Sequence, residues 1–213
     1  MATALIAGST GLVGSQLLNL LLEEPSYDKV IALVRKPLGI QHPKLVNKVV
    51  NFDSLADAGR DLQADDVFCC LGTTIKQAGS QAAFRKVDYE YPLSLARQTH
   101  ALGAKQFLII TAMGSSKSSS IFYNRVKGEV EEAISSVGFE TIHILQPSLL
   151  LGDRKDDRSG ESTGKVVMKV LDFAIPKKYK AIESVKVAKA MLALARQKQK
   201  GTHVHHSGEL QNY

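Results

Sequence analysis

The chain has 213 residues, of which 44% are hydrophobic and 23% charged, and its formal net charge at pH 7 is +6. This length suits a single domain with a full α/β core, and the composition excludes an intrinsically disordered chain. No apolar run approaches the length of a membrane span, and the first apolar residues belong to a strand rather than a signal peptide, so we expect a cytoplasmic protein without a membrane span.

The positive charge is confined to the last part of the chain. Residues 1–150 carry 14 basic and 14 acidic side chains, whereas residues 151–213 carry 13 and 7. Lysines spaced along helices are typical of a solvated face, and neither aromatic residues interleaved with them nor a helix-turn-helix pattern accompanies them. We therefore expect no nucleic-acid partner, and an acidic ligand or anionic surface stays open.

The only two cysteines, Cys69 and Cys70, are adjacent. They cannot form a disulfide framework, which indicates a reducing compartment. We interpret them as packing residues rather than as a vicinal redox pair.

Three glycines follow the first predicted strand. The apolar run Ala4–Ala7, in a strand predicted at 3–8, leads into Gly8-x-x-Gly11-x-x-Gly14, and leucines recur on one face of a predicted helix at 12–23. In this order, glycines let the backbone approach a pyrophosphate, whose charge meets the free N–H groups at the start of the helix. An ordinary strand-to-helix turn is the alternative. The residues expected to hold the cofactor here are Gly8, Ser9, Thr10, Gly11, Leu12, Val13 and Gly14.

Strands and helices alternate along the rest of the chain. The predicted strands lie at 3–8, 29–35, 45–51, 66–71, 105–111 and 141–147, and the predicted helices at 12–23, 80–102, 121–136, 162–173 and 184–198. This alternation predicts a Rossmann-type, doubly wound parallel sheet with helices on both faces. We expect one NAD(P)-binding domain, 1–213, in which 1–150 is the dinucleotide-binding core and 151–213 forms a small substrate-side and C-terminal segment. Ligands then bind at the carboxyl ends of the strands.

Basic residues follow the second predicted strand. Arg35 and Lys36 stand about twenty residues beyond the last glycine, where a dinucleotide fold places an acid on the ribose 2′-hydroxyl or a cation on a 2′-phosphate. No carboxylate occurs in this short segment, so the sequence favours NADP(H) over NAD(H). A surface arginine without a ligand is the alternative.

Two further loops are expected to contact the adenosine half of the cofactor. After the third strand, Asp53 either accepts a hydrogen bond from the adenine amino group or caps the next helix. After the fourth strand, small residues let the backbone pass close to the ligand. These residues are Cys70, Leu71, Gly72 and Thr73.

An acid–base pair follows the fifth strand. Tyr123 and Lys127 are four residues apart on a predicted helix and therefore share one face. An ammonium within reach of a phenol favours the phenolate and lowers the tyrosine pKa, which creates a general acid/base usable near neutral pH.

These motifs resemble the short-chain dehydrogenase/reductases, in their extended and atypical branch, and within it the Tat-interacting-protein-like NAD(P)-binding oxidoreductases. The resemblance covers nearly the whole chain and depends on the motifs Gly8-Ser9-Thr10-Gly11-Leu12-Val13-Gly14, Cys70-Leu71-Gly72-Thr73-Thr74, Tyr123-x-x-x-Lys127-Gly128-Glu129 and Gln146-Pro147-Ser148-Leu149-Leu150. It implies that Tyr123 is the acid/base and that Lys127 holds the nicotinamide ribose and tunes Tyr123. It also implies that Pro147, Ser148 and Leu149 line the nicotinamide end.

The chain departs from the family pattern at two positions. Thr111-Ala112 stands where the family has a catalytic serine, and Thr111 retains a hydroxyl that could orient a substrate carbonyl. Ser115 and Ser116 are alternative hydroxyl donors. Gln146 stands where relatives often carry arginine.

The C-terminal part is expected to form the substrate side. A charged loop at 152–160 precedes an amphipathic helix at 166–173, and such loops often act as lids. His203 and His205 share one face of a last strand. No metal site is expected there, because the pairing edge of a strand explains the alternating histidines as well.

The sequence therefore predicts an oxidoreductase that uses NADPH and a Tyr123/Lys127 acid–base pair to reduce a small carbonyl substrate, with Thr111 as the third catalytic group. The alternative is an NADP(H)-binding regulatory or partner-binding module with little or no catalysis, which the Thr111-Ala112 departure and the basic tail favour. The substrate is not identified, and a monomer or homodimer is expected.

Overall fold

The computed structural model describes residues 2–152 and 179–213. Its main feature is a seven-stranded sheet in the order β3-β2-β1-β4-β5-β6-β9, in which every neighbouring pair is parallel. The strands are β1 (Ala2–Ala7), β2 (Tyr27–Val34), β3 (Leu45–Val49), β4 (Asp66–Cys69), β5 (Gln106–Ile110), β6 (Thr141–Gln146) and β9 (Gly201–His206). A second, two-stranded sheet pairs β7 (Leu150–Leu151) with β8 (Ile182–Glu183). The strand order reverses between β1 and β4, which creates the switch point where such folds bind ligands.

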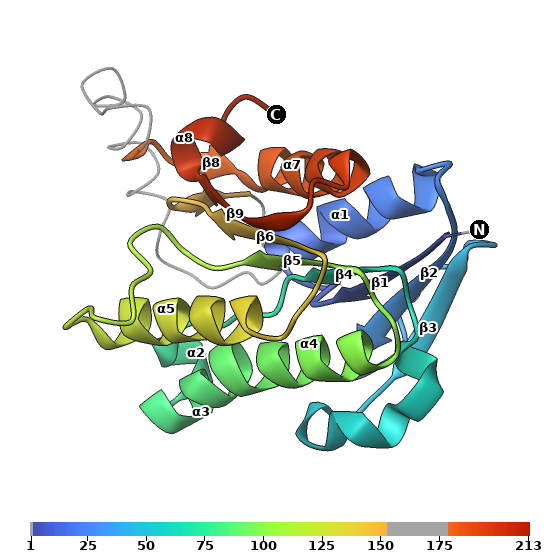
Figure 1. Ribbon diagram of the computed structural model, residues 1–213, viewed down its shortest axis with the longest axis horizontal. Coiled ribbons are helices and arrows are strands. Elements are labelled where there is room, and N and C mark those ends of the chain that lie inside the picture. The colour runs from blue at the N-terminus through green and yellow to red at the C-terminus, as the bar shows by residue number, and fades with distance from the viewer. Residues whose placement is uncertain (1, 153–178) are drawn as a thin grey trace.

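Helices cover both faces of the large sheet (Figure 1). One face carries α1 (Leu12–Glu23), α7 (Ser184–Gln197) and the short α8 (Ser207–Leu210). The other face carries η1 (Phe52–Leu62), α2 (Ile75–Ala78), α3 (Gln81–Arg85), η2 (Lys86–Glu90), α4 (Tyr91–Ala101) and α5 (Phe122–Ser135). The expected doubly wound Rossmann-type fold is thus confirmed.

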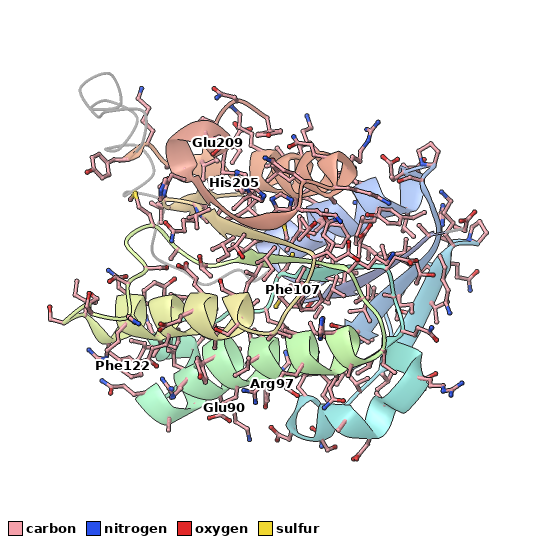
Figure 2. The ribbon with its side chains drawn as sticks, viewed as in Figure 1. Glu90, Arg97, Phe107, Phe122, His205 and Glu209 are labelled. Carbon is pink, nitrogen blue, oxygen red and sulfur yellow. The ribbon has the colours of Figure 1, made fainter. Side chains whose placement is uncertain are left out.

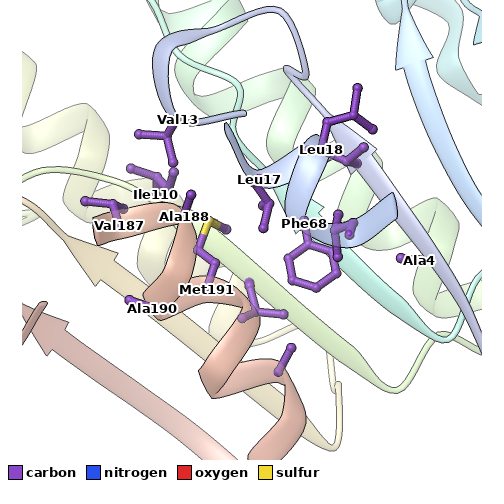
Figure 3. Close-up of a cluster of buried hydrophobic side chains, with 14 of the residues drawn as sticks. Ala4, Val13, Leu17, Leu18, Phe68, Ile110, Val187, Ala188, Ala190 and Met191 are labelled. Atoms are coloured by element: carbon purple, nitrogen blue, oxygen red, sulfur yellow. The ribbon is translucent and has the colours of Figure 1, made fainter. Parts of the chain in front are cut away.

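The core consists of two apolar layers separated by the sheet. Alternate residues of a strand point to opposite faces, so Ile6 of β1 joins the layer beneath α1 and α7, whereas Leu5 joins the layer beneath α4 and α5. Figure 3 shows the first layer, where Phe68 of β4 lies with Leu17 of α1 and Met191 of α7. All five side chains are fully buried. Because both faces are covered, the strands are apolar on both sides rather than alternating with polar residues.

The observed elements follow the expected positions closely, with one informative break. The predicted helix at 80–102 is divided into α3, η2 and α4, and η2 is one turn of π-helix at Lys86–Glu90. A π-turn adds a residue to the helical repeat, and here it carries Asp88 into the protein interior. Sequence periodicity missed this turn, and it also missed η1 and α2.

Some expectations fall outside the described residues. The charged loop beyond Gly152, the amphipathic helix at 166–173 and their suggested role as a lid all belong to 153–178. Among the helices that the structure does describe, none combines the length and apolar character needed to cross a bilayer.

Candidate functional site

The three glycines of the turn after β1 have different roles. A Cβ atom at Gly8, whose φ is +86°, would lie 2.4 Å from the Cys70 carbonyl oxygen, and one at Gly14 would lie 2.1 Å from the Gly8 carbonyl oxygen. No side chain fits at either position, so these two glycines are required by the packing of strand, turn and helix. A Cβ at Gly11 would meet only the Gly8 carbonyl oxygen, at 3.3 Å, and Gly11 is exposed. The middle glycine therefore leaves open space rather than filling a packing requirement.

That open space belongs to a cleft of about 910 Å³ at the carboxyl ends of β1, β2 and β4. It lies at the switch point of the sheet, as the fold class predicts. The cleft is lined by Gly8, Ser9, Thr10, Gly11, Leu33, Val34, Arg35, Lys36, Phe52, Cys70, Leu71, Gly72, Thr73, Gln77, Ala78, Ala83, Val87 and Tyr91. The sequence-predicted loops after β1, β2 and β4 are thus brought together in one place. A second cavity of about 330 Å³ lies at the opposite, amino-terminal ends of the strands, far from these loops.

The start of α1 is suited to an anionic ligand. Gly11 is the N-cap residue of α1, and no side chain caps the first amides of the helix. Ser9 is 3% exposed, and in the described part of the chain its Oγ has no hydrogen-bond partner. Uncapped amides and a buried, unpartnered hydroxyl are the groups that the pyrophosphate of a dinucleotide would satisfy. The residues present therefore fit such a cofactor.

Two cations stand at the β2 side of the cleft. Arg35 and Lys36 line it, both are exposed, and neither forms an ion pair with a described acidic residue. They are placed where the sequence analysis expected a 2′-phosphate contact.

Asp53 does not cap a helix, so that interpretation is wrong. The cap of η1 is Asn51, whose side chain accepts a hydrogen bond from the Asp53 amide at 3.0 Å. The Asp53 carboxylate instead accepts from the Tyr91 hydroxyl at 2.5 Å and lies 2.7 Å from the Lys86 ammonium. These contacts, the one from Lys86 first, lower the pKa of Asp53. Asp53 is outside the residues that line the cleft, whereas its neighbour Phe52 is among them.

The loop after β4 both lines the cleft and packs against the apolar core. Cys70, Leu71, Gly72 and Thr73 line the cleft. Burial raises the pKa of the Cys69 thiol to about 12 and holds that of Cys70 well above its usual value, so both thiols stay protonated. Cys70 Sγ lies 3.8 Å from Met191 Sδ in the apolar layer. These observations support packing rather than redox chemistry.

A buried ion pair lies behind this loop. Lys127 of α5 is 5% exposed and Asp88 of η2 is 1% exposed, and Lys127 Nζ lies 2.7 Å from Asp88 Oδ1. The other carboxylate oxygen of Asp88 accepts the Thr73 amide at 2.9 Å. A Cβ at Gly72 would lie 3.5 Å from Asp88 Oδ1 and 3.7 Å from Lys127 Nζ, so the pair lies directly beneath the cleft wall.

The charge state of Lys127 depends on this partner. Burial lowers the pKa of Lys127, but the Asp88 carboxylate and Tyr123 oppose burial, and the net shift is upward. Burial raises the pKa of Asp88, and Lys127 opposes that shift. The ammonium is therefore protonated at neutral pH. Asp88 is the site residue that the sequence analysis missed, because an acid inside a predicted helix is typical of a solvated face.

Tyr123 lies on the same face of α5 as Lys127. It is half-buried, and its ring packs against Phe84 of α3 with the ring centroids 5.4 Å apart. Gly128, next to Lys127, is also constrained: a Cβ there would lie 2.2 Å from the Ser116 carbonyl carbon. The serine-rich loop after β5 therefore packs directly on α5. Among the described residues that line the cleft, neither Tyr123 nor Thr111 is included.

Thr111 is buried just after β5, and its hydroxyl is already engaged. Thr111 Oγ1 donates to the Leu145 carbonyl oxygen at 3.3 Å, and the Thr111 amide donates to the same oxygen at 2.8 Å. To donate to a substrate carbonyl, the hydroxyl would have to release Leu145. The alternative donor Ser115 is likewise engaged, since its hydroxyl donates to the Ala112 carbonyl oxygen at 2.6 Å.

The segment after β6 is tied to the C-terminal elements. Pro147 and Ser148 are buried, and Leu149 is 57% exposed. The Ser148 hydroxyl donates to the Lys180 carbonyl oxygen and accepts from the Ser207 hydroxyl at 2.9 Å. The Pro147 and Leu149 carbonyl oxygens also accept backbone amides, from Met113 and Ile182, so the exposed Leu149 side chain is the part of this segment that is open to a ligand.

Gln146 has a partner on α5. Its amide nitrogen lies 3.0 Å from each carboxylate oxygen of Glu131. A neutral donor here holds β6 to α5 without adding a positive charge beside the site.

A chain of histidines lies at the β9 edge of the sheet, away from the cleft. His143 Nδ1 of β6 lies 3.0 Å from His205 Nε2 of β9, and His205 Nδ1 lies 2.8 Å from Glu209 Oε1 of α8. His205 and Glu209 appear together near α8 in Figure 2. The ring of His203 stacks on that of His143 at 5.3 Å. Within the described ranges no three His, Cys, Asp or Glu side chains are grouped to hold a metal ion.

Comparison with known proteins agrees with this geometry. The model of the NAD dependent epimerase/dehydratase family matches residues 4–134. Protein HTATIP2 of Rattus norvegicus is 35% identical over 191 residues, covering 88% of this chain and 78% of that protein. Protein FMP52, mitochondrial, of Coccidioides immitis is 30% identical over 218 residues, covering 95% of this chain and 89% of its own length.

Solved structures show the same fold at low identity. The Bordetella bronchiseptica enzyme WbmH in complex with NAD+ superposes with a TM-score of 0.72 at 17% identity, covering 97% of this chain and 76% of that one. MoeE5 in complex with UDP-glucose and NAD has a TM-score of 0.70 at 14% identity, covering 95% and 74%. These structures hold a dinucleotide in the fold that this chain shares.

The relatives correct one expectation. FMP52 proteins from several fungi, at 30–34% identity, are named mitochondrial, so the expected cytoplasmic location is wrong. The features behind that expectation, adjacent cysteines and the lack of a long apolar run, report on redox conditions and membrane spans. They do not distinguish one reducing compartment from another.

Proposed function

The chain belongs to the NAD-dependent epimerase/dehydratase family, and we propose that within this family it is an NADPH-dependent reductase of small carbonyl compounds. The observation that carries the proposal is the Lys127 ammonium, kept charged by Asp88 and placed beneath Gly72 in the wall of the cleft. The same cleft begins at the glycine turn. Lys127 of α5 would hold the ribose of a dinucleotide whose pyrophosphate is held at this turn.

Each part of the cofactor has a complementary group on this chain. The amides at the start of α1 and the unpartnered Ser9 hydroxyl would hold the pyrophosphate. Arg35, with Lys36 beside it, would hold the 2′-phosphate. Asp53 and the Cys70–Thr73 loop would contact the adenosine half, Lys127 the nicotinamide ribose, and Pro147–Leu149 the nicotinamide end.

A bound nicotinamide would supply the hydride. The side chains of this chain would donate the proton, stabilise the developing charge and orient the substrate. Tyr123 donates a proton to the oxygen of the substrate carbonyl. The Lys127 charge stabilises negative charge that develops on the Tyr123 oxygen. Thr111 orients the carbonyl once its hydroxyl exchanges the Leu145 carbonyl for the substrate oxygen. Since the fungal relatives are named mitochondrial, we assign this activity to mitochondria.

The glycine turn offers a test of cofactor binding with a built-in control. A Cβ at Gly11 makes one tight contact, 3.3 Å from the Gly8 carbonyl oxygen, and otherwise faces the cleft, so the Gly11→Val variant is expected to fold and to lose NADPH binding. Gly14→Val would collide with the Gly8 carbonyl and is expected to prevent folding. Circular dichroism and fluorescence titration with NADPH separate the two effects. A folded Gly11→Val protein that binds NADPH like the wild type would show that the cleft is not the cofactor site.

The reductase itself is tested by following NADPH absorbance with a panel of aldehydes and ketones. Turnover that depends on a carbonyl compound supports the proposal. NADPH binding without turnover on any of them would instead favour the binding module without catalysis.

A further inference from the structure

The exposed large apolar side chains of the protein gather at one edge. Of the ten in the described residues, six lie in the segments that follow β4, β5 and β6 or directly precede β8. These six are Ile75, Met113, Ile121, Leu149, Leu151 and Tyr179, with exposed fractions from 37% to 59%. Apolar surface that gathers beside a site can bind an apolar ligand. We name this set the apolar rim.

The apolar rim is connected to the proposed catalytic residues. Met113 follows Thr111, and its amide donates to the Pro147 carbonyl oxygen at 2.9 Å. Ile121 is the N-cap residue of α5, two positions before Tyr123. Leu151 precedes Gly152, at which a Cβ would lie 2.7 Å from a Leu12 side-chain carbon beside the glycine turn. The rim therefore spans the edge from α5 to the start of α1.

Several polar groups of the same loops are already engaged within the protein. The hydroxyls of Thr111, Ser115 and Ser148 all donate to backbone carbonyl oxygens. Two cations of this edge are engaged as well, since Arg125 donates to the Ser119 carbonyl oxygen at 2.9 Å and Lys117 pairs with Glu132. A sugar or a nucleotide phosphate needs several donors, and recruiting these groups would break the bonds that they already form.

We propose that the substrate is a hydrocarbon-rich ketone or aldehyde whose alkyl or aryl part lies on the apolar rim. This inference rests on the proposed reductase function and narrows its substrate class. Solved proteins of the same fold hold UDP-glucose, but at 14% identity they share the fold alone with this chain. The described loops offer exposed apolar side chains beside Tyr123, and the Thr111, Ser115 and Ser148 hydroxyls are engaged, which favours an apolar substrate over a nucleotide sugar.

The test measures binding rather than turnover. Isothermal titration of protein saturated with NADP+, which cannot reduce a carbonyl, gives dissociation constants for butanone, hexanone and octanone. Because each added methylene is transferred from water onto the apolar rim, the affinity is expected to rise about fourfold per methylene. UDP-glucose is titrated under the same conditions and is expected to bind more weakly than octanone.

Matched variants locate the surface. Ile121→Ser and Leu151→Ser, made together, are expected to weaken octanone binding about tenfold and to leave butanone binding and NADP+ binding unchanged. Val204→Ser on β9 is the control, because Val204 is 44% exposed but lies outside the rim. It is expected to bind every ketone as the wild type does.

Each outcome decides the inference. Equal affinities for butanone, hexanone and octanone, in a protein that binds NADP+, would show that these ketones do not lie on the rim. This result would overturn the inference and leave the proposed function untouched. Tighter binding of UDP-glucose than of octanone would also overturn it. A protein that does not bind NADP+ would refute the proposed function, and the inference would fall with it.

Discussion

Two buried polar pairs in this protein differ in charge: Lys127 is charged, whereas His143 is neutral at neutral pH. Lys127 and Asp88 lie 2.7 Å apart beneath the cleft wall, and the pKa of Lys127 is raised. His143 and His205 lie 3.0 Å apart at the β9 edge, and the pKa of His143 is lowered to about 4. Both Lys127 and His143 are penalised by burial when charged, but only Lys127 faces a carboxylate. The charge of each buried group therefore depends on the side chain that it contacts and not on burial alone.

The difference in charge matches the surroundings of the two pairs. Under the proposed function, the reaction requires a cation beside the cofactor and Tyr123, and the Lys127 ammonium held by Asp88 would provide it. At the β9 edge, the His143 ring shares a hydrogen bond with His205, whose Nδ1 donates to Glu209 Oε1. The neutral His143 ring thus links β6 to β9 without the cost of a buried charge on His143.

Removing the carboxylate should have the largest effect. Asp88→Ala leaves the Lys127 ammonium buried without its partner, and we expect a loss of about 3–5 kcal/mol in the free energy of unfolding. Asp88→Asn keeps the shape and the Thr73 contact, so it should cost less. Urea unfolding of both variants measures the difference. If Asp88→Ala is as stable as the wild type, Lys127 is not held by this pair.

The histidine pair should give a pH-dependent effect. Because the pKa of His143 is about 4 in the folded state and about 6.5 when unfolded, the unfolded chain binds more protons between these pH values. This contribution to stability is complete above pH 6.5 and is lost as the pH falls toward 4, by about 3 kcal/mol. His143→Gln should remove this pH dependence, whereas His206→Gln, at an exposed position of β9, should retain it. Urea unfolding across this pH range is the measurement, and equal pH profiles for the two variants would contradict the assignment.

The contrast between the two pairs also shows what sequence can and cannot predict. The strand, glycine turn and helix at the start of the chain were located from local pattern alone, because apolar periodicity and glycine spacing are properties of neighbouring residues. His203 and His205 were placed on one face by the same kind of argument. Their partner His143 was missed, because it is 62 residues away in sequence and is brought to His205 only by the pairing of β6 with β9.

The site was predicted in the same uneven way. The loops after β1, β2 and β4 do meet in one cleft, since parallel strands end at one edge. Asp88 was missed because its inward position depends on the π-turn, which helical periodicity does not reveal. The assignment of Asp53 as a possible cap failed because Asn51, two residues earlier, takes that role.

A cation that is exposed instead of buried should show a smaller and more selective effect. Arg35 lines the cleft without an ion-pair partner among the described residues, so Arg35→Ala should leave the fold intact. Losing one charge-assisted phosphate contact should weaken NADPH binding by about 1.5–3 kcal/mol, roughly one to two decades in dissociation constant, and leave NADH binding unchanged. Fluorescence titration with both cofactors is the check. Equal wild-type affinities for NADPH and NADH would refute the assigned preference.

The central claim is that Tyr123 and Lys127 of α5 act together as an acid–base pair, and Tyr123→Phe tests it most directly when NADPH turnover and NADPH affinity are measured on the same protein. The account predicts that Tyr123→Phe lowers turnover by about 10²–10⁴-fold and largely keeps cofactor affinity. Lys127→Ala should lower both turnover and affinity, the double variant should be little worse than either single one, and Thr111→Ala should cost less than Tyr123→Phe. Turnover that survives Tyr123→Phe unchanged would show that the proton comes from another group and would contradict the account.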